Sequence, residues 1–211
     1  GPPVLALHGT PGSRTKFAMA DSSAADLGLR LVAVDRWGYG GTGQPARPSL
    51  ALFADDMAQL ADALGLTRFG ILGVSGGGPY AAAVAARLGS RITALALVAP
   101  VGPIVDAPDR VKLSSFHTFC FRVLPRVPGA VRLTFAVFRL LLVVSASGAM
   151  RVAAARASRA DRSALCTPAA RDGLAGCFRL GLARGVSGPV IDLRLFSRPW
   201  DIELRAISAP T

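Results

Sequence analysis

The first hundred residues contain four short apolar runs, and the segments between the last three have the periodicity of helices. These runs are almost continuously apolar, as is typical of strands that are buried on both faces of a sheet. Strands that alternate with helices form βαβ units, so the pattern predicts an α/β fold with a mostly parallel sheet and flanking helices. The predicted strands are Pro3–His8, Leu29–Asp35, Phe69–Val74 and Ile92–Ala99, and the predicted helices are Leu50–Leu66 and Gly78–Leu88.

After residue 100 the strand pattern gives way to helical periodicity. Apolar residues recur at helical spacing from Leu113 to Leu124, and Pro125 is expected to end that helix. A second helix is predicted over Val131–Val144, and Thr167-Pro168 is expected to begin a third. No strand is predicted in this segment, which is therefore expected to be a helical cap over the core. The expected organisation is a core over residues 1–100, a cap over residues 101–200, and a return to the core over residues 201–211, where a truncated strand starts.

Basic residues outnumber acidic residues, and most of the excess lies in the second half of the chain. The net charge is +11, of which residues 1–100 carry +2 and residues 101–211 carry +9. Such basicity would suit nucleic acid or an anionic membrane. However, 22 of the 24 basic residues are arginines that occur singly, and no nucleic-acid-binding motif is present. We therefore expect arginines that face solvent, and no nucleic-acid partner.

The cysteines and the start of the chain favour a reducing, cytoplasmic location. Cys120, Cys166 and Cys177 are odd in number and lack metal-ligand or CxxC spacing, so we expect small buried apolar residues. No charged segment followed by an apolar stretch and a cleavage site opens the chain. No residue pattern predicts a metal or a cofactor.

The most apolar stretch of the chain is Val131–Val144. It is 14 residues long, whereas a bilayer span needs about 20 apolar residues. Arg132 and Arg139 are seven residues apart and so lie on one side of a helix. We expect an amphipathic helix packed on the protein and no stable membrane span; an interfacial membrane helix is the alternative.

A G-x-S-x-G motif, Gly73-Val74-Ser75-Gly76-Gly77, lies between the third predicted strand and the helix that follows it. A serine on such a sharp turn adopts strained backbone angles, and the flanking glycines let neighbouring backbones approach closely. The turn exposes the hydroxyl above the sheet, and the helix N-terminus behind it favours developing negative charge. The alternative, a phosphate-binding loop, requires a lysine that is absent from this segment. Ser75 is therefore the candidate nucleophile.

A second motif, His8-Gly9-Thr10-Pro11-Gly12, directly follows the first predicted strand. Acyl transfer requires backbone N–H groups that stabilise an oxyanion, one from the residue after the nucleophile and one from a nearby loop. Gly76 supplies the first, and we choose Thr10 for the second because Pro11 has no N–H. The loop meets Ser75 if the first strand lies between the second and the third, because ligands bind where the strand order reverses.

These motifs and two others together resemble the α/β-hydrolase fold family, in its branch of esterase-like hydrolases with a helical cap. The resemblance is specific over residues 1–103 and continues loosely through the cap to residue 211. It implies a nucleophile at Ser75, an oxyanion hole from Thr10 and Gly76, and a cap over a hydrophobic substrate pocket. Ser75 excludes the branches with an aspartate nucleophile, such as epoxide hydrolases and haloalkane dehalogenases. The segments that carry the resemblance are His8–Ser13 (HGTPGS), Val34–Gly43 (VDRWGYGGTG), Gly73–Ala83 (GVSGGGPYAAA) and Leu97–Pro100 (LVAP).

The base and the acid that a serine nucleophile needs are not evident in the sequence. In the family the order is serine, acid, histidine, but the one histidine after Ser75 is His117, within the first predicted cap helix. We expect that the chain is incomplete, that the acid and the histidine follow Thr211, and that the chain is nearly inactive without them.

Other polar residues are weaker candidates for these roles. Asp106 and Asp109 follow the fourth predicted strand, where some relatives carry the acid. His8 precedes the turn and is better placed to hold the loop's backbone than to act as a base. The remaining acidic residues near the motifs are better explained as loop and helix-surface residues: Asp35, Asp55 and Asp56.

Residues 38–43 also fit the G-x-G-x-x-G dinucleotide fingerprint, but their context is wrong. Three residues separate them from the strand, and a proline-rich segment follows where the helix should start. We expect a tight excursion of the chain beside the pocket, and no nucleotide.

Two functions follow from the sequence. The first is a serine hydrolase that acts on a small, hydrophobic, ester-like or related acyl substrate and has no cofactor. The alternative is a non-catalytic homologue that binds a small hydrophobic ligand or a partner. The identity of the substrate, the oligomeric state, and lyase instead of hydrolase chemistry remain open, because a fold does not fix a reaction.

Overall fold

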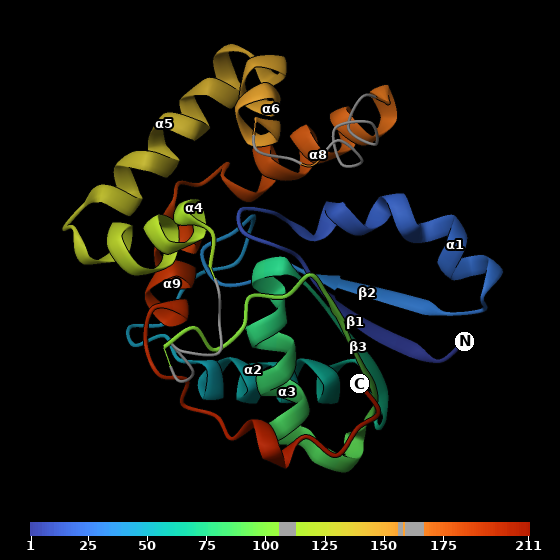
Figure 1. Ribbon diagram of the computed structural model, residues 1–211. Coiled ribbons are helices and arrows are strands. Elements are labelled where there is room, and N and C mark those ends of the chain that lie inside the picture. Colours follow the sequence, from blue (N-terminus) through green and yellow to red (C-terminus); the bar gives the residue numbers. More distant parts are fainter. Residues whose placement is uncertain (106–112, 156–157, 159–166) are drawn as a thin grey trace.

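Four parallel strands form one sheet in the computed structural model, which describes residues 1–105, 113–155, 158 and 167–211. The strands are β1 (Pro3–Leu7), β2 (Arg30–Val34), β3 (Phe69–Val74) and β4 (Ile92–Val98). Their order is β2-β1-β3-β4, and Leu5 in β1 pairs with Val32 on one side and Ile71 on the other. The structure confirms the four predicted strands and their parallel direction (Figure 1). It also places β1 between β2 and β3, which is the condition under which the two motifs are expected to meet.

Helices cover both faces of this sheet (Figure 1). The two predicted core helices, α2 (Leu50–Ala63) and α3 (Gly78–Leu88), lie side by side on one face. On the other side, the 3₁₀ segment η1 (Arg14–Ala20) leads into α1 (Asp21–Asp26). The sequence does not predict this connection, because six or seven residues are too few to show a helical period.

The main core lies between the sheet and α2 and α3. Phe53 on α2 is 1% exposed, and its ring meets the rings of Trp37 and Tyr80 edge-on, at centroid distances of 5.2 and 4.7 Å. Such edge-to-face pairs contribute about 0.5–1.5 kcal/mol beyond the area that they bury. The buried residues of this core include Leu5, Leu7, Leu50, Phe53, Met57, Phe69, Ile71, Tyr80, Val84, Ile92 and Leu95.

The segment after β4, which we call the cap after the role expected from the sequence, is helical in its described residues and stands at one end of the sheet (Figure 1). Its elements are α4 (Ser115–Thr118), the π-helical turn η4 (Phe119–Val123), η5 (Leu124–Arg126), α5 (Ala130–Val144), α6 (Ala146–Ala154), α8 (Pro168–Gly181) and α9 (Ser187–Phe196). The three predicted cap helices are present, and α6 and α9 are additional. Pro125 does not end the first of them as predicted. It lies within the 3₁₀ turn η5, because a proline in a first turn has no bonded N–H to lose.

Helix α5 confirms the predicted helix over Val131–Val144 and packs on the protein, but its exposed side is more apolar than we expect from the sequence. Its inner side is buried at Val131 and Leu142, yet its outer side is also apolar, and Leu133 and Leu140 are 67% and 61% exposed. Among the described residues, no single helix is long and apolar enough to cross a bilayer. Segments Ser115–Arg126 and Ala130–Val144 reach that length only as a pair, with a bend of 117° between them.

The last residues of the chain return to the core. Asp201 accepts hydrogen bonds from the N–H groups of Leu50 and Ala51 (3.0 and 3.3 Å), which satisfies two donors at the start of α2. The Pro210 carbonyl accepts a hydrogen bond from the N–H of Leu95 in β4 (2.8 Å). Residues 201–211 form a 3₁₀ turn, η6 (Leu204–Ala206), followed by chain without regular secondary structure. The strand that we expect to start in this segment stays a prediction.

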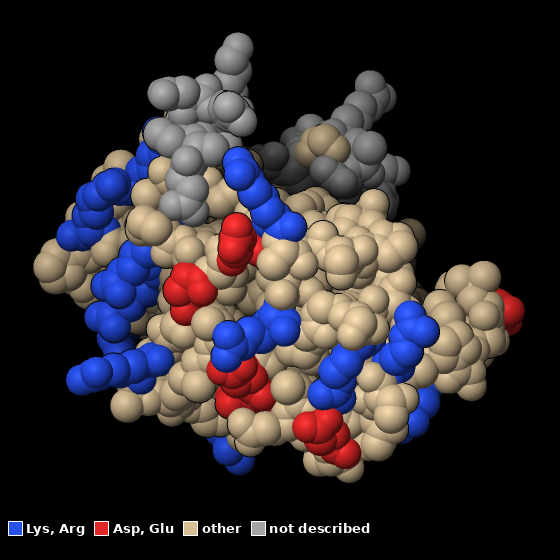
Figure 2. Space-filling model, turned by 90° about the horizontal axis from the view of Figure 1, so that it is seen from below, with Lys and Arg blue, Asp and Glu red and all other residues tan. Residues whose placement is uncertain are grey.

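Acidic side chains lie among the basic ones on the face that Figure 2 shows, which is the side of α2 and α3. Two ion pairs link α2 to α3 and to the turn after α3. Arg87 Nε lies 2.8 Å from Asp55 Oδ1, and Arg91 lies 2.7 Å from Asp62. Exposed pairs of this kind contribute little to stability. This face has the mixed charge of a solvent-facing surface, in keeping with the expected solvated arginines.

We predict that Phe53→Ala lowers the free energy of unfolding by about 3–5 kcal/mol. The substitution leaves a cavity that the neighbouring rings, which are packed edge-on, cannot fill. Chemical denaturation followed by circular dichroism measures this. Leu52→Ala is the matched control on the same helix, since Leu52 is 36% exposed. Equal losses for the two variants would show that α2 does not pack as described.

Candidate active site after β3

Ser75 lies in the turn between β3 and α3 with a left-handed backbone conformation. Its φ is +52°, a region that costs a non-glycine residue about 1–3 kcal/mol. The flanking glycines allow the turn: a methyl group at Gly73 would lie 2.7 Å from Ala81 Cβ, and one at Gly77 would lie 2.3 Å from the Leu7 carbonyl oxygen. The Ser75 residue is half-buried. Its hydroxyl is therefore carried on a strained turn at the edge of the core rather than inside it.

The loop after β1 meets the start of α3 beside Ser75. A methyl group at Gly9 would lie 3.2 Å from Ser75 Cβ, and one at Gly76 would lie 3.2 Å from the backbone nitrogen of Thr10. The structure thus brings together the three predicted site residues, Ser75, Thr10 and Gly76. Within the described part of the chain, no hydrogen bond from the Thr10 or the Gly76 N–H to another element is found. Both groups are therefore candidate donors to a ligand.

A buried ion pair between Arg36 and Asp192 lies against this loop. Both side chains are 1% exposed, and Arg36 donates two hydrogen bonds to the carboxylate, at 2.5 and 2.9 Å. Arg36 also donates to the carbonyls of His8 (3.0 Å) and Gly9 (3.1 Å), and the Thr10 hydroxyl donates to Asp192 (2.5 Å). Three consecutive loop residues are therefore held by one ion pair.

Two tyrosines complete the surroundings of Asp192. The hydroxyls of Tyr39 and Tyr80 donate to its two carboxylate oxygens at 2.6 and 2.7 Å. Burial, and then the charge of Asp192, raises the pKa of both tyrosines above the usual range, so both keep their protons. Burial opposes the charge of Arg36, but Asp192 outweighs it and raises the pKa of Arg36. The cluster therefore holds a charged pair whose donors and acceptors are satisfied.

His8 is buried, and backbone groups occupy both of its ring nitrogens. The N–H of Arg36 donates to Nε2 (3.1 Å), so Nδ1 carries the proton and donates to the Gly9 carbonyl (2.8 Å). Burial, followed by the charge of Arg36, holds the pKa of His8 well below its usual value. His8 is therefore neutral and braces the loop, and it has no free nitrogen to act as a base.

The cap helices α8 and α9 contact the same loop. Asp192 lies on α9, and on α8 the Cys177 sulfur and carbonyl accept hydrogen bonds from the N–H and hydroxyl of Ser13 (3.2 and 2.9 Å). The backbones touch where α8 ends, since a methyl group at Gly181 would lie 2.0 Å from the Gly12 carbonyl oxygen. The loop is thus fixed by the cap as well as by the sheet.

A cavity of about 890 Å³ lies between this loop and the cap. Its volume falls in the range of small-molecule sites. Among the described residues that line it there is no charged side chain, and Ser75 itself is absent, although Ser75 adjoins the loop at Gly9. The lining residues are Thr10, Pro11, Phe116, Leu133, Thr134, Phe135, Val137, Phe138, Leu141, Val152, Ala155 and Phe178.

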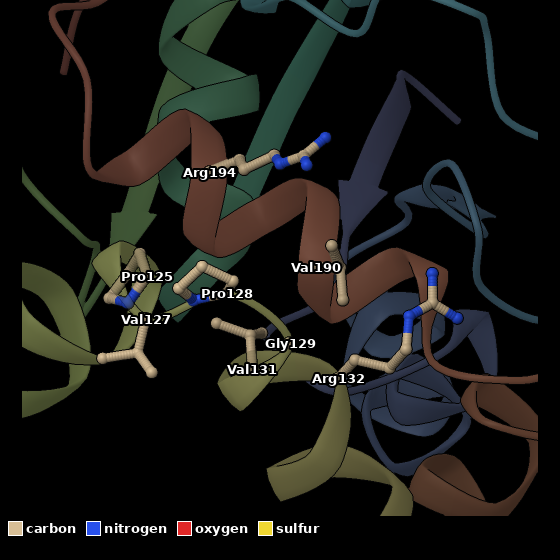
Figure 3. A pocket seen from close by; sticks show the side chains of 8 residues that line it. All are labelled: Pro125, Val127, Pro128, Gly129, Val131, Arg132, Val190 and Arg194. Atoms are coloured by element: carbon tan, nitrogen blue, oxygen red, sulfur yellow. The ribbon is translucent and has the colours of Figure 1, made fainter.

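A second, smaller hollow of about 170 Å³ lies between the start of α5 and α9 (Figure 3). Two prolines and three valines line it, and Arg132 and Arg194 extend away from the prolines. It contains none of the predicted site residues.

The remaining histidine has partners of its own, and two of the acidic candidates are not described by the structure. His117 is exposed on α4, with Nδ1 2.8 Å from the Ser114 hydroxyl and its ring stacked on Phe121. Asp106 and Asp109 lie outside the described residues.

Three other acidic residues have structural partners. Asp35 lies in the loop after β2, as expected, and is buried there. It accepts a hydrogen bond from the Arg14 N–H (2.7 Å) and forms an ion pair with the Arg14 side chain. Asp56 accepts a hydrogen bond from the Trp37 indole N–H (2.9 Å). Asp55 pairs with Arg87 on the surface.

The cysteines and the acidic residues form no metal site in the part of the chain that the structure describes. No group of three or more His, Cys, Asp or Glu side chains converges there. Cys177 is buried, as expected, and Cys120 is half-buried. Cys166 lies outside the described residues.

The sequence interpretation missed the cluster of Arg36, Tyr39, Tyr80 and Asp192. Arg36 and Tyr39 lie within the Val34–Gly43 run, and a charged residue just after a buried strand was an available signal. The signal at Asp192 was weaker. Apolar residues flank it in Val190–Leu193, but no nearby residue indicates that its partner is Arg36.

Comparisons with known proteins match the chain to one fold family. A family model described as the alpha/beta hydrolase fold matches residues 2–125. A solved structure, an alpha/beta hydrolase fold protein from Nakamurella multipartita, is 31% identical, with a TM-score of 0.62 over 100% of this chain and 73% of that protein.

Two curated relatives match over shorter segments. A Bacillus subtilis protein named as a 2-succinyl-6-hydroxy-2,4-cyclohexadiene-1-carboxylate synthase is 33% identical over 97 residues, 44% of this chain and 35% of that protein. A proline iminopeptidase of Clostridium botulinum is 33% identical over 82 residues, 37% of this chain and 28% of that protein. The matches therefore span about a third of the length of these relatives.

We predict that Asp192→Asn lowers the free energy of unfolding by about 3–5 kcal/mol, because it leaves Arg36 charged and unpaired in the interior. Thermal or chemical denaturation measures the change. Asp55→Asn, which removes the exposed partner of Arg87, is the control and should change stability little. A loss no larger for Asp192→Asn than for this control would contradict the role given to the cluster.

We predict that stability falls as the pH falls below about 6.5, the usual pKa of an unfolded histidine. Because the pKa of His8 is lower in the folded protein, the unfolded chain binds more protons in this range, and the loss reaches at most about 1.4 kcal/mol per pH unit. Denaturation between pH 7 and pH 5 measures the slope. His8→Gln should flatten it and His117→Gln should keep it; the reverse pattern would refute the assignment.

Proposed function

The chain belongs to the α/β-hydrolase fold family, and from this premise we propose that it is a serine hydrolase with Ser75 as its nucleophile. The substrate is ester-like or a related acyl compound. The observation that carries the proposal is the strained Ser75 turn beside two candidate backbone donors, the N–H groups of Thr10 and Gly76.

In the proposed reaction the Ser75 hydroxyl passes its proton to the base as its oxygen attacks the acyl carbon, and the carbonyl oxygen becomes an oxyanion that accepts hydrogen bonds from the N–H groups of Thr10 and Gly76. Collapse of this intermediate breaks the ester bond, the alcohol leaves with the proton held by the base, and water then hydrolyses the acyl-enzyme. One such N–H donor is typically worth about 3–4 kcal/mol of transition-state stabilisation. The N-terminus of α3 adds a favourable dipole. Arg36 and Asp192 do not touch the reacting atoms; they position the loop that carries the Thr10 donor.

The base and the acid are proposed to follow Thr211 in the full-length protein. Two observations support this: His8 and His117 are engaged elsewhere, and β4 has an exposed edge, with Val98 50% exposed. Further strands could pair there and bring a histidine toward Ser75. Translation of the coding sequence beyond Thr211 tests this directly.

The proposed substrate is small and hydrophobic. The cavity next to Thr10 and Pro11 is lined by aromatic and aliphatic side chains, without an arginine among its described residues. An arginine-rich cap therefore gives no reason to favour an anionic substrate.

The alternative is a non-catalytic homologue that binds a small hydrophobic ligand in the same cavity. The apolar lining and the absence of a base among the described residues favour it. Ligand-induced stabilisation without turnover of the full-length protein would support this alternative.

We predict that the full-length protein hydrolyses short-chain aryl esters and is labelled by a serine-reactive phosphonate. Ser75→Ala should abolish both. A protein of residues 1–211 alone should retain only a trace of activity, because a missing triad member removes most of the catalysis. Ser147→Ala, at an exposed serine of α6, is the matched control and should behave as the parent protein. Labelling that survives Ser75→Ala would overturn the assignment.

A further inference from the structure

We propose that the outer face of α5, formed by Leu133, Val137, Leu140 and Val144, docks on an anionic lipid surface. This goes beyond the proposed function and does not depend on the identity of the nucleophile. It develops the interfacial alternative that the sequence of Val131–Val144 leaves open.

The outer face of α5 is a continuous apolar stripe with no protein covering it in the described structure. Its residues follow at intervals of four, three and four, which places them on one side of a helix. Leu133, Val137, Leu140 and Val144 are 67%, 48%, 61% and 74% exposed. Figure 1 shows α5 along the outer rim of the cap, and the helices that contact it are α6, α8 and α9. Such stripes on a soluble domain mark interaction sites.

The charge around this face selects an anionic partner. Residues 113–155 contain five arginines and no acidic residue. In the part of the chain that the structure describes, none of the five forms an ion pair. Arg132 lies on the flank of α5 with its guanidinium directed away from Val131 and the neighbouring prolines (Figure 3). The five are Arg122, Arg126, Arg132, Arg139 and Arg151.

The same charge argues against a second copy of the chain as the partner. A symmetric dimer through α5 would bring the same patch from each copy face to face, and so would bring together the exposed arginines of α5, Arg132 above all, from both copies, with no acid on that helix to pair with them. Anionic headgroups supply the missing negative charge, and acyl chains accept the apolar stripe. A helix of 15 residues suits this arrangement because it lies in the interface rather than across the bilayer.

The large cavity adjoins this surface. Leu133 and Val137 belong both to the outer face and to the cavity lining, and Phe116 and Val152, which also line the cavity, are 43% and 60% exposed. A hydrophobic compound dissolved in lipid would therefore enter the cavity without crossing water. This consequence for the substrate rests on the proposed function, whereas the docking itself does not.

The experiment is co-sedimentation of the full-length protein with vesicles of phosphatidylcholine alone or with about one third phosphatidylglycerol. We expect at least about tenfold stronger binding to the anionic vesicles, and loss of the difference as salt rises from about 50 to 500 mM. Leu140→Glu and Val144→Glu should each weaken binding about tenfold or more. Arg132→Gln, which keeps the apolar stripe, should weaken it about fivefold.

Leu27→Glu is the matched control, because Leu27 is 73% exposed and follows α1, away from the cap. It should leave binding unchanged, as should Ser75→Ala, which separates this proposal from the catalytic one. Equal loss in Leu27→Glu and Leu140→Glu would overturn the proposal, as would equal binding to both vesicle types. A dimer in sedimentation velocity that Leu140→Glu dissociates, with no vesicle binding, would assign the face to a second copy instead.

Discussion

The ion pair between Arg36 and Asp192 fixes the geometry on which the candidate site depends. Burying two charges is costly unless the geometry is good and the remaining lone pairs are satisfied. Here two tyrosine hydroxyls, the Thr10 hydroxyl and two backbone carbonyls meet that condition. The carbonyls belong to the loop that presents the Thr10 N–H. The position of that donor is therefore set by Asp192, a residue of the cap. The cap and the core are held together at this point by the ion pair.

The strands and the serine turn were predictable because their signals are local. A continuous apolar run such as Phe69–Val74 indicates a buried strand wherever it occurs, and glycines on both sides of Ser75 indicate a sharp turn before a helix. The strand order was only a condition for the two loops to meet, and the structure meets that condition with β1 between β2 and β3. Thr10, Gly76 and Ser75 come together for that reason.

The rest of the site depends on contacts that the sequence does not encode locally. Asp192 lies 156 residues from Arg36, and an acid on a helix is more often exposed than buried. Helix α5 was misjudged in the same way. Arg132 and Arg139 suggested a polar outer side. However, Val131 and Leu142 pack inward, so the two arginines lie on the flank of the helix and leucines lie on its outer side. Tertiary contacts, not periodicity, decide which side of such a helix faces the protein.

The central claim is that Ser75 faces an oxyanion hole made by Thr10 and Gly76, and a crystal structure of the full-length protein with a phosphonate bound to Ser75 tests it most directly. The measured quantities are the distances from the phosphonyl oxygen to the two backbone nitrogens. We expect both to be about 2.7–3.1 Å. An oxygen directed into solvent, or toward donors from another loop, would contradict the account.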